Sequence, residues 1–516
     1  MDNIVALCKR RGFIFQSSEI YGGLNGAWDY GPLGAQLKKN IKDHWWKTHT
    51  QLRDDILGMD GSILMNRAVW QATGHESTFS DPMVDCLLTN QRMRADQIDP
   101  QSGTVYSFTG AKSDELSLEK KMKYSVLVKT GEDANKARKT AKKFYAKDLK
   151  DPNNFKSIEL LGETKEEVKD STQYNPENGS LLTEPREFNL MFKTFIGPTD
   201  DNSSLTYLRP ETAQSMFVQF KNVLDTSRKK LPFGIAQIGK AFRNEINPRN
   251  FTFRSREFEQ MEIEFFVKPG SGLEWCEHWL EERLKWYESI GIPRSKIHIL
   301  DVPDNERAFY SKKTYDLEYE FPFGIQELEG IAYRTDYDLS CHQKSSGKPL
   351  EYFDEETKEK YIAHVVEPSA GVDRTALAVI CEAYTEEQIT DEKGKTEVRT
   401  VLRLTPSIAP IKVGVFPLLK NKPELVAKAK EVEKLLRPHM STFYDESGAI
   451  GRRYRRQDEI GTPFCVTIDF ETLEGLEEEG KLEGPKNTIT LRHRDSMKQE
   501  RLPIDALVEK LLPQLQ

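Results

Sequence analysis

The stretch AFRNEINPRNFTFRSREFEQMEIEFF, residues 241–266, constrains the fold most strongly because two alternating runs meet in it. Neighbouring side chains of a strand point to opposite faces. The run GIAQIGKAFRNE therefore predicts a strand face that carries Ile235, Gln237, Gly239, Ala241, Arg243 and Glu245. The run FEQMEIEFF predicts one face with Phe258, Gln260, Glu262 and Glu264, and an opposite face with Met261, Ile263 and Phe265. We expect an antiparallel pair of strands joined by a loop of about ten residues.

The same stretch carries charges of both signs at close spacing. Its basic residues are Arg243, Arg249, Arg254 and Arg256, and its acidic residues are Glu245, Glu257, Glu259, Glu262 and Glu264. One interpretation is a solvated hairpin, in which each cross-strand ion pair contributes a fraction of a kcal/mol. The other is a site that holds a polyanion and an ammonium group side by side. The hairpin alone leaves both interpretations open.

Three other stretches place arginines next to acidic residues. LRPETAQSMF carries Arg209 and Glu211, and IQELEGIAYRTDYDL carries Glu327 and Arg334. In EPSAGVDRTALAVICEAY, a turn with Gly371 precedes a helix that has Arg374 in its first turn. An arginine is unfavourable at the positive end of a helix dipole, so an anionic ligand explains it better than helix stability does. Scattered surface ion pairs are the alternative, but arginines on several separate strands favour a nucleotide site.

A phosphate-loop spacing lies just upstream of these arginines. Residues 234–241, GIAQIGKA, match G-x-x-x-x-G-K, but Ala241 stands where the motif has a magnesium-binding Ser or Thr. The interior of the match is also rich in strand-forming residues rather than in glycine. We therefore expect arginines, and not a backbone cradle, to hold any nucleotide phosphates.

Length and composition bound the class of protein. A chain of 516 residues predicts roughly three folding units. With 37% hydrophobic and 30% charged residues and a net charge of −8, it is typical of an acidic globular protein and not of a purely electrostatic nucleic-acid binder. The start MDNIVALCKRRGFIF lacks the pattern of a signal peptide, and no run of eighteen apolar residues occurs, so we expect a cytoplasmic protein without membrane contact. The scattered Cys8, Cys86, Cys276, Cys341, Cys381 and Cys465 predict neither a disulfide nor a structural zinc site.

Periodicity and composition divide the chain into segments. Residues 32–52 predict an amphipathic helix, with Leu33, Leu37, Ile41 and Trp45 four apart and Pro32 at its first turn. Residues 101–180 differ from their surroundings and predict an insertion, which contains the basic, helix-permissive run NKARKTAKKFYAKDLK. The polar run TEEQITDEKGKTEVRTVLRL, residues 385–404, has the composition of a linker. After it, strand-like runs alternate with a helix, which predicts a small α/β domain.

Several of these motifs together resemble one enzyme family. GFIFQSSEIYGGLNGAWDYGPLG, RPETAQ, FRNEI with REFEQMEIEFF, EPSAGVDR and GRRYRRQDEIGTPFCVTID resemble the single-chain, homodimeric class II glycyl-tRNA synthetases. The resemblance spans nearly the whole chain except the insertion, and the class I signatures H-x-G-H and K-M-S-K-S are absent. In these terms Pro32 and its helix form motif 1, Arg243 lies in motif 2 and Arg374 lies in motif 3.

The resemblance implies an α+β fold with a catalytic domain on an antiparallel sheet flanked by helices, and a C-terminal α/β anticodon-binding domain. Residues 1–100 and 181–400 would form the catalytic domain, 101–180 the insertion, and 401–516 the anticodon-binding domain. The implied activity is the ATP-dependent attachment of glycine to its tRNA through a glycyl-adenylate. Two alternatives stay open: another class II synthetase, for threonine, proline or histidine, and a non-catalytic RNA-binding relative.

The resemblance also assigns site residues. Arg243, Glu245 and Arg374 are the implied catalytic residues. Those implied to bind ATP are Arg243, Asn244, Glu245, Phe253, Arg254, Arg256, Phe258, Glu327, Leu328, Gly371 and Arg374. Glu327 is also the expected ligand of Mg²⁺. Those implied to bind glycine are Arg94, Glu211, Phe258, Glu262, Glu367, Ser369 and Gly371.

Two basic stretches are candidates for tRNA contact. Arg452, Arg453, Tyr454, Arg455 and Arg456 suit stacking on unpaired bases and phosphate contact, as an anticodon loop offers. The basic run of the insertion is either a second RNA contact or a solvated helix face. The chain departs from the family pattern at Ser215, where Gly is usual, and at Asp373, where Glu is common.

Overall fold

The computed structural model describes residues 1–113, 118–149, 158–390, 394, 396–475, 477–478, 481–482 and 486–515. The chain divides into two compact units. The first comprises Met1–Thr73, Lys193–Arg243 and Arg249–Gln516, and the second comprises Gly74–Phe192 and Asn244–Pro248. The second unit therefore contains the predicted insertion but begins before it and ends after it. Among the described residues, no helix has the length and apolar character needed to cross a membrane.

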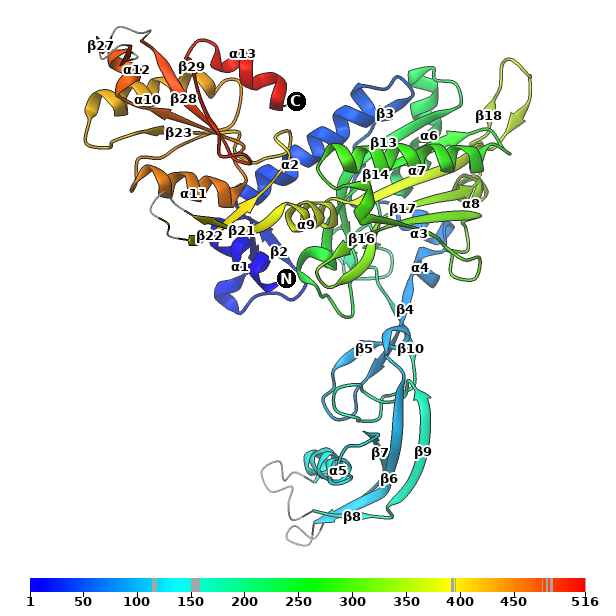
Figure 1. The fold of residues 1–516 in the computed structure, drawn as a ribbon. Coiled ribbons are helices and arrows are strands. Elements are labelled where there is room, and N and C mark those ends of the chain that lie inside the picture. The colour runs from blue at the N-terminus through cyan, green and yellow to red at the C-terminus, as the bar shows by residue number, and fades with distance from the viewer. Residues whose placement is uncertain are drawn as a thin grey trace. The chain divides into compact units, whose positions relative to one another are not determined.

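The first unit is built on a sheet with the strand order β15-β16-β17-β20-β14-β13-β3 (Figure 1). Its strands are β3 (Ile56–Gly58), β13 (Phe233–Phe242), β14 (Glu257–Val267), β15 (Ile297–Asp301), β16 (Lys313–Phe321), β17 (Gly324–Thr335) and β20 (His364–Gly371). Neighbouring strands pair antiparallel, except that β3 and β13 are parallel. The prediction of an antiparallel sheet is confirmed.

The hairpin predicted from the alternating runs is present as β13 and β14. These strands pair antiparallel with Ala241 opposite Phe258. Met261 and Ile263 are buried in the hydrophobic core, while Glu262 lies on the other face. The connecting segment covers residues 243–256, which is longer than the loop of about ten residues that the pattern predicts. Because β13 ends at Phe242, the prediction that Arg243 and Glu245 continue this strand is wrong.

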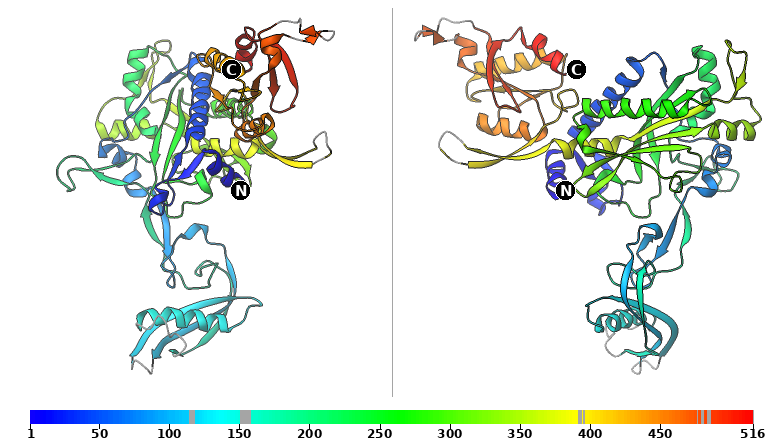
Figure 2. Two further views of the ribbon diagram at one scale, coloured as in Figure 1. Left: turned by 90° about the vertical axis from the view of Figure 1, so that its left-hand side faces the viewer. Right: turned by 45° about the vertical axis from the view of Figure 1, so that its right-hand side comes forward.

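Helices cover both faces of the sheet. The face with Ile263 packs against α2 (Pro32–Trp46), α7 (Gly272–Ser289) and α9 (Val372–Ala383). The opposite face packs against α6 (Ala213–Ser227) and α8 (Tyr337–Ser346). Figure 2 shows the green and yellow strands of this sheet, with their helices, from two further sides. The predicted motif 1 helix is confirmed as α2, in which Leu37, Ile41 and Trp45 are buried.

Shorter elements complete this part of the first unit. Its remaining helices are α1 (Asp2–Arg11), α3 (Arg67–Ala72), the 3₁₀-helices η1 (Glu19–Tyr21), η4 (Phe251–Phe253) and η5 (Arg294–Lys296), and the π-helix η2 (Lys47–Gln51). Its remaining strands are β1 (Ile14–Gln16), β2 (Trp28–Tyr30), β11 (Lys193–Phe195), β12 (Leu205–Tyr207), β18 (Tyr352–Phe353) and β19 (Lys360–Tyr361).

The C-terminal residues form a smaller α/β structure. Its sheet has the order β24-β23-β25-β28-β29, with β23 parallel to β24 and β25 and the remaining pairs antiparallel. Its elements are β23 (Val413–Pro417), α10 (Pro423–Leu436), β24 (Thr442–Tyr444), α11 (Ile450–Ile460), β25 (Phe464–Ile468), α12 (Phe470–Glu474), β26 (Glu477–Glu478), β27 (Lys481–Leu482), β28 (Thr488–His493), β29 (Gln499–Pro503), α13 (Leu507–Leu511) and η6 (Leu512–Leu515). A separate hydrophobic cluster holds this sheet against α10 and α13. The prediction of a C-terminal α/β domain is confirmed.

The segment predicted as a linker, residues 385–404, is instead mostly a β-hairpin. Strands β21 (Tyr384–Thr390) and β22 (Thr396–Leu402) pair antiparallel with Tyr384 opposite Leu402. Val401 and Leu402 are buried, and Arg399 is buried with them. The polar composition misled the prediction because the hairpin is stabilised by ion pairs as well as by apolar packing.

The second unit combines two small sheets and a helix. One sheet has the order β7-β6-β8 with β9 also paired to β6, and the other has the order β10-β4-β5. Its elements are α4 (His75–Thr78), β4 (Ser80–Asp85), β5 (Arg92–Arg94), η3 (Ala95–Gln97), β6 (Gln101–Ser113), β7 (Leu118–Lys129), α5 (Asn135–Asp148), β8 (Ile158–Leu161), β9 (Thr164–Ser171) and β10 (Arg186–Asn189). The basic run of the insertion forms α5, which buries Ala137, Ala141 and Tyr145 against the larger sheet. Lys139 and Lys143 are exposed on this helix.

Candidate active site

The arginine predicted in motif 3 lies in the first turn of α9, one turn from Gly371. The Nε of Arg374 donates a hydrogen bond to the backbone oxygen of Phe253 at 3.2 Å. Its Nη1 donates to the backbone oxygen of Glu327 at 3.2 Å and lies 3.3 Å from the carboxylate Oε2 of the same residue. The guanidinium carbon is 4.4 Å from the centre of the Phe253 ring. Four residues predicted to bind ATP are therefore brought together by α9, β17, β20 and the loop after β13.

The motif 2 arginine follows directly after β13. The Nε of Arg243 donates to the backbone oxygen of Pro210 at 3.1 Å, and its guanidinium carbon lies 5.4 Å from the centre of the Phe258 ring. Its backbone N–H donates to the oxygen of Arg256 at 2.9 Å, which closes the base of the loop. Phe258 begins the next strand, so the arginine and the aromatic ring are held together by the hairpin geometry.

Three guanidinium groups lie around Glu327, and we call Arg243, Arg254 and Arg374 the guanidinium cluster. The positive charge of Arg374 lowers the pKa of the Glu327 carboxyl, and the charges of Arg243 and Arg254 lower it further. Preorganised arginines of this kind bind phosphate groups and stabilise charge that develops on them. The cluster therefore suits the triphosphate of ATP.

A second carboxyl group lies beside this cluster. Burial raises the pKa of Asp316 on β16 to about 7, and the nearby Glu327 and Glu318 add to the rise. Carboxylate oxygens are the ligands that hard divalent cations prefer. Glu327 and Asp316 are thus the residues of this site that fit a divalent metal bound with ATP.

The remaining residues predicted to bind ATP have other surroundings. The backbone N–H of Arg256 donates to the oxygen of Gly26 at 2.8 Å, and its Nη1 donates to the oxygen of Asn25. The side chain of Leu328 is buried in the hydrophobic core. Asn244 belongs to the second unit, where its N–H donates to the oxygen of Leu190 at 2.7 Å.

Four acidic residues gather elsewhere in the first unit, and we call Glu211, Glu262, Glu264 and Glu367 the acidic cluster. Glu262 and Glu264 lie on β14, Glu367 lies on β20, and Glu211 lies in the segment before α6. Glu262 is buried, and its Oε1 accepts from the Ser369 hydroxyl at 2.7 Å. Its Oε2 accepts from the Thr212 hydroxyl. Of the residues predicted to bind glycine, Glu211, Glu262, Glu367 and Ser369 are thus placed together.

A buried arginine joins this cluster to α8. Nη1 of Arg334 donates to Glu367 Oε2, while its Nε and Nη2 donate to the two Asp338 oxygens at 2.8 and 2.9 Å. Gln214 links the same carboxylate to the cluster, because its Nε2 donates to Asp338 Oδ1 and to Glu211 Oε1, each at 2.9 Å. This network fixes the carboxylates in a buried part of the first unit, where charge interactions are strong.

The cluster holds more carboxyl groups than Arg334 can compensate. Burial raises the pKa of Glu262, and the neighbouring Glu211 raises it further. Burial raises the pKa of Glu367 to about 8, although Arg334 opposes the shift. Burial also raises the pKa of Glu264 well above its usual range, with Glu367 and Glu262 adding to the shift. Such an excess of buried negative charge fits a small cationic ligand, and the ammonium group of an amino acid is one.

Sequence reasoning missed several members of this site. The sequence places Arg334 among the arginines that favour a nucleotide site, but its guanidinium instead pairs with Glu367 and Asp338. Thr212 and Gln214 belong to the RPETAQ stretch, and Asp338 follows Arg334 by four residues. The signal that was available for Glu264 is its alternation with Glu262 on β14, which puts the two side chains on one face.

Arg94 and Glu245, two predicted site residues, both lie in the second unit. The guanidinium of Arg94 pairs with Asp81 and with Asp96, each at 2.6 Å. A hydrogen bond to Asp96 raises the pKa of Arg94 against burial, and the charges of Asp81 and Glu245 add to the rise. The structure therefore brings these two residues near each other within that unit.

The two departures from the family pattern have structural contacts. Asp373 accepts from Lys38 Nζ at 2.9 Å and from the backbone N–H of Glu259 at 2.7 Å, so it ties α9 to α2 and β14. The hydroxyl of Ser215 donates to the oxygen of Thr212 at 2.8 Å and thereby closes the first turn of α6.

The predicted anticodon stretch forms α11, and its residues differ in exposure. Arg453 is buried and donates to the backbone oxygens of Pro417 and Gly448. The Tyr454 hydroxyl lies 2.6 Å from that of Thr467. Arg452 is exposed. Stacking or phosphate contact is thus open to Arg452, whereas Arg453 supports the domain.

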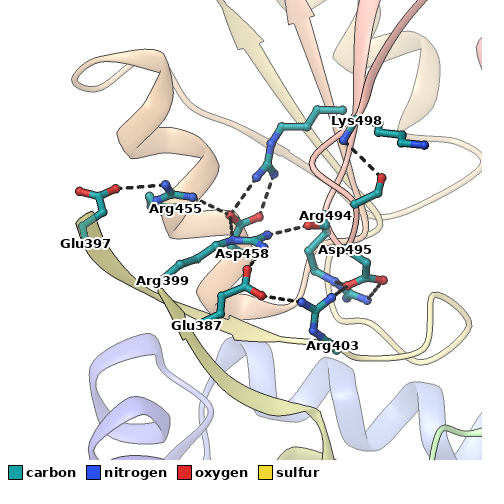
Figure 3. Close-up of polar contacts among 11 residues, drawn as sticks. Glu387, Glu397, Arg399, Arg403, Arg455, Asp458, Arg494, Asp495 and Lys498 are labelled. Atoms are coloured by element: carbon teal, nitrogen blue, oxygen red, sulfur yellow. Dashed lines mark hydrogen bonds and ion pairs between the residues drawn. The ribbon is translucent and has the colours of Figure 1, made fainter. Parts of the chain in front are cut away.

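Neighbouring residues of α11 belong to an ion-pair network around Asp458 (Figure 3). Arg399 on β22 and Arg492 on β28 both pair with this buried carboxylate, at 2.9 and 2.8 Å. Arg455 lies 3.6 Å from Asp458 and 3.1 Å from Glu397. The network joins the hairpin to the C-terminal α/β structure.

Comparisons with known proteins agree with this arrangement. Residues 192–384 match the family model "tRNA synthetase class II core domain (G, H, P, S and T)", and residues 412–514 match the model "Anticodon binding domain". Proteins named glycine–tRNA ligase are similar over nearly the full length. That of Deinococcus radiodurans is 49% identical over 526 residues, which cover 98% of this chain and 97% of the relative. That of Treponema denticola is 46% identical over 512 residues, which cover 99% and 96%. That of Clostridium perfringens is 47% identical over 516 residues, which cover 99% and 98%. The chain therefore belongs to the glycine–tRNA ligase family, with a class II synthetase core and an anticodon-binding domain.

Proposed function

We propose that this protein attaches glycine to its tRNA in an ATP-dependent reaction that passes through a glycyl-adenylate. The observation that carries the proposal is that two clusters of opposite charge border the same sheet: the guanidinium cluster on α9 and the loop between β13 and β14, and the acidic cluster on β14, β20 and the segment before α6. One cluster suits a polyphosphate and the other suits an ammonium group. Membership of the glycine–tRNA ligase family supports the choice of glycine.

In the first step, an oxygen of the glycine carboxylate attacks the α-phosphorus of ATP. A bond forms between that oxygen and phosphorus, and the bond from the α-phosphorus to the bridging oxygen breaks, so that pyrophosphate leaves. The carboxylate is ionised at neutral pH, so no general base is needed. Arg243, in motif 2, is the residue that contacts the α-phosphate, and Arg374 contacts the γ-phosphate. Their contribution is positioning and charge compensation.

Mg²⁺ is the metal we assign to the ATP site, with Glu327 as a ligand and Asp316 beside it. When bound with ATP, a divalent cation neutralises phosphate charge. The side chains supply the rest: Phe258 stacks on the adenine ring, and Phe253 with Arg254 borders the nucleotide. The Arg374 guanidinium carbon lies 4.4 Å from the centre of the Phe253 ring, which supports a position of both residues beside the nucleotide.

Glycine is selected by its ammonium group and by the lack of space for a side chain. Glu211, Glu262 and Glu367 accept hydrogen bonds from the ammonium, and the hydroxyl of Ser369 holds Glu262 in place. Because glycine is the smallest amino acid, a filled site rejects every competitor sterically, and no editing step is required.

In the second step, the 3′-hydroxyl of the terminal ribose of the tRNA attacks the glycyl carbonyl carbon of the adenylate, and AMP leaves. We assign tRNA binding to the C-terminal domain, with Arg452 and the partly exposed Arg455 and Arg456 at the anticodon. The exposed lysines of α5 are a second candidate contact. We further propose a homodimer that works in the cytoplasm.

Amino-acid-dependent exchange of pyrophosphate into ATP tests the proposal. We expect exchange with glycine and none with threonine, proline or histidine. Arg243→Ala should abolish exchange while tRNA binding persists. Activity with threonine but not with glycine would assign the chain to another class II specificity, and exchange with none of these amino acids would favour a non-catalytic RNA-binding role.

A further inference from the structure

The loop between β15 and β16, residues 302–312, is not used by the proposed mechanism, although it reaches the network around the acidic cluster. We call it the β15–β16 loop. Its base is fixed to the sheet, because the N–H of Lys312 donates to the oxygen of Tyr333 at 2.9 Å. Among the described residues, the hydrogen bonds of residues 303–310 all end within the loop itself. The position of its tip is therefore set by contacts of side chains with the rest of the unit.

The tip contacts the buried arginine of the acidic network through Tyr310. The guanidinium carbon of Arg334 lies 4.1 Å from the centre of the Tyr310 ring and 5.4 Å from the centre of the Phe217 ring of α6. Arg334 is buried, Tyr310 is half-buried, and the adjacent Phe309 is 70% exposed. The tip thus borders solvent, and the Tyr310 ring covers the arginine. A cation over an aromatic ring is held more strongly when both are shielded from water.

Arg334 connects this ring to the carboxylates of the site. It donates to Glu367, which we propose as an acceptor for the glycine ammonium, and to both oxygens of Asp338. Burial raises the pKa of the Tyr310 hydroxyl; the charge of Arg334 opposes the rise, and the charges of Glu367 and Glu211 add to it. Tyr310 therefore lies within the electrostatic reach of the glycine site.

Shielding from water matters for this ion pair. The attraction between two charges is several times stronger in a protein interior than in water, and salt screens an exposed pair more than a buried one. If the ring left Arg334, water would reach the guanidinium and weaken its bond to Glu367. The carboxylate of Glu367 would then be free to leave the orientation in which the structure holds it.

We propose that Tyr310 is a positioning residue of the glycine site: its ring shields Arg334 from water, and the shielded guanidinium holds Glu367 in the orientation that receives glycine. The inference rests on the proposed function and deepens it, because it assigns part of the affinity for glycine to a side chain that does not touch the substrate. Coupling between two binding events is reciprocal. Bound glycine must therefore stabilise the β15–β16 loop on Arg334 in turn.

Limited digestion of the full chain with trypsin tests this reciprocity without any substitution. The loop offers cleavage after Arg307 and Lys312, and the exposed Lys358, between β18 and β19, is an internal reference outside the loop. We expect saturating glycine to slow cleavage in the loop by up to about tenfold and to leave cleavage after Lys358 unchanged, with fragments identified by mass spectrometry. Equal cleavage rates in the loop with and without glycine would overturn the inference.

Variants of Tyr310 test the same coupling in pyrophosphate exchange. For Tyr310→Ala we expect KM for glycine to rise about tenfold, while kcat and KM for ATP stay within about twofold of the parent values. In this variant KM for glycine should also rise further with added salt, because ions screen the uncovered pair of Arg334 and Glu367. Tyr310→Phe keeps the ring and should have the parent KM. Phe353→Ala, which removes a partly exposed ring near Lys358, is the matched control and should behave like the parent.

Three results in these variants would contradict the inference. They are a Y310A protein with the parent KM and salt dependence, an equal rise of KM for glycine and for ATP in Y310A, and the same rise of KM for glycine in Y310F as in Y310A. Failure of this inference alone would leave glycine-dependent exchange by the parent intact. Absence of that exchange in the parent would instead reject the proposed function, and this inference with it.

Discussion

Arg374 Nη1 lies 3.3 Å from Glu327 Oε2, so the first turn of α9 and the strand β17 meet in an ion pair next to Phe253. Glu327 is about half exposed, which keeps the pair open to a ligand. An incoming triphosphate would compete with Glu327 for the guanidinium, and a divalent cation would compensate the carboxylate that is released. The pair is therefore a ready contact point for ATP with its metal.

Replacing Arg374 with alanine should impair the use of ATP. The variant removes one of three positive charges from the guanidinium cluster, and we expect kcat/KM for ATP to fall about 10²- to 10³-fold. Pyrophosphate exchange at saturating glycine measures this change. The surface variant Arg294→Ala, which removes an exposed pair with Glu281, is the control and should retain activity. Equal losses in the two variants would argue against a role of Arg374 at the nucleotide.

Replacing Glu262 with glutamine should impair the use of glycine. Loss of a charged acceptor predicts a rise of KM for glycine of about 10- to 100-fold, because a hydrogen bond to a charged group contributes about 1.5–3 kcal/mol. KM for ATP should stay within twofold of the parent value. An equal rise of KM for glycine and of KM for ATP would indicate a structural defect instead.

The stability of the protein should respond to Glu264 in a defined pH direction. Its pKa in the folded state is raised by burial above the unfolded value, which is about 4.3 for glutamate. The stabilising contribution is therefore complete below about pH 4.3 and is lost as pH rises towards and through the folded pKa. Glu264→Gln, which carries no ionisable group, should gain stability relative to the parent as pH rises from about 5 to 8. Denaturation midpoints measured without glycine at several pH values test this, and a difference that is constant with pH would contradict it.

Disruption of the ion-pair network around Asp458 should lower the free energy of unfolding by a large amount. Asp458→Asn would leave the buried Arg399 and Arg492 without their shared carboxylate, and breaking a buried pair in this way costs about 3–5 kcal/mol. Chemical denaturation followed by circular dichroism should show a lower midpoint. Glu397→Gln removes only the half-exposed partner of Arg455 and should cost less than about 1 kcal/mol. Similar midpoints in the two variants would show that the network contributes little.

Variants of two adjacent arginines of α11 should distinguish a role in RNA contact from a role in domain stability. Arg452→Ala removes an exposed charge and should weaken tRNA binding, with the slope of log affinity against log salt reduced by about one. Arg453→Ala removes hydrogen bonds to Pro417 and Gly448 and should lower the unfolding midpoint of the domain. Binding at several salt concentrations, with unfolding curves for both variants, tests the pair. If R452A binds tRNA with the affinity and salt dependence of the parent, Arg452 does not contact the RNA.

Alternation and periodicity predicted the elements whose two faces differ sharply in polarity. The strands β13 and β14 and the helix α2 follow directly from such patterns, because burial of one face fixes the register. The same logic puts Glu264 beside Glu262, yet sequence alone gives no distance between Glu264 and Glu367, which comes from a different strand more than a hundred residues later. The sequence therefore assigns no role to Glu264.

Contacts between charged residues that are far apart along the chain cannot be predicted from the sequence alone. The polar composition of residues 385–404 predicts a linker because the burial of Arg399 is not visible in it: Glu387 of the same run is one partner, but the buried partner Asp458 lies 59 residues away along the chain. For α11, a helical signal was present, since Arg453, Gln457 and Ile460 lie three and four residues apart and are all buried. The charge of the RRYRR run concealed this periodicity.

Arg399 belongs by sequence to the segment before the C-terminal domain, but its hydrogen-bond acceptors include Asp458 and the backbone oxygen of Arg494 inside that domain. A truncation after residue 403 would expose the Arg399 guanidinium, which is buried in the intact chain, and would remove its acceptors in the C-terminal domain. The position at which the chain passes from one domain to the other thus differs from the limit of the contacts that stabilise the C-terminal domain. An isolated catalytic fragment would therefore need the hairpin removed along with the domain that completes it.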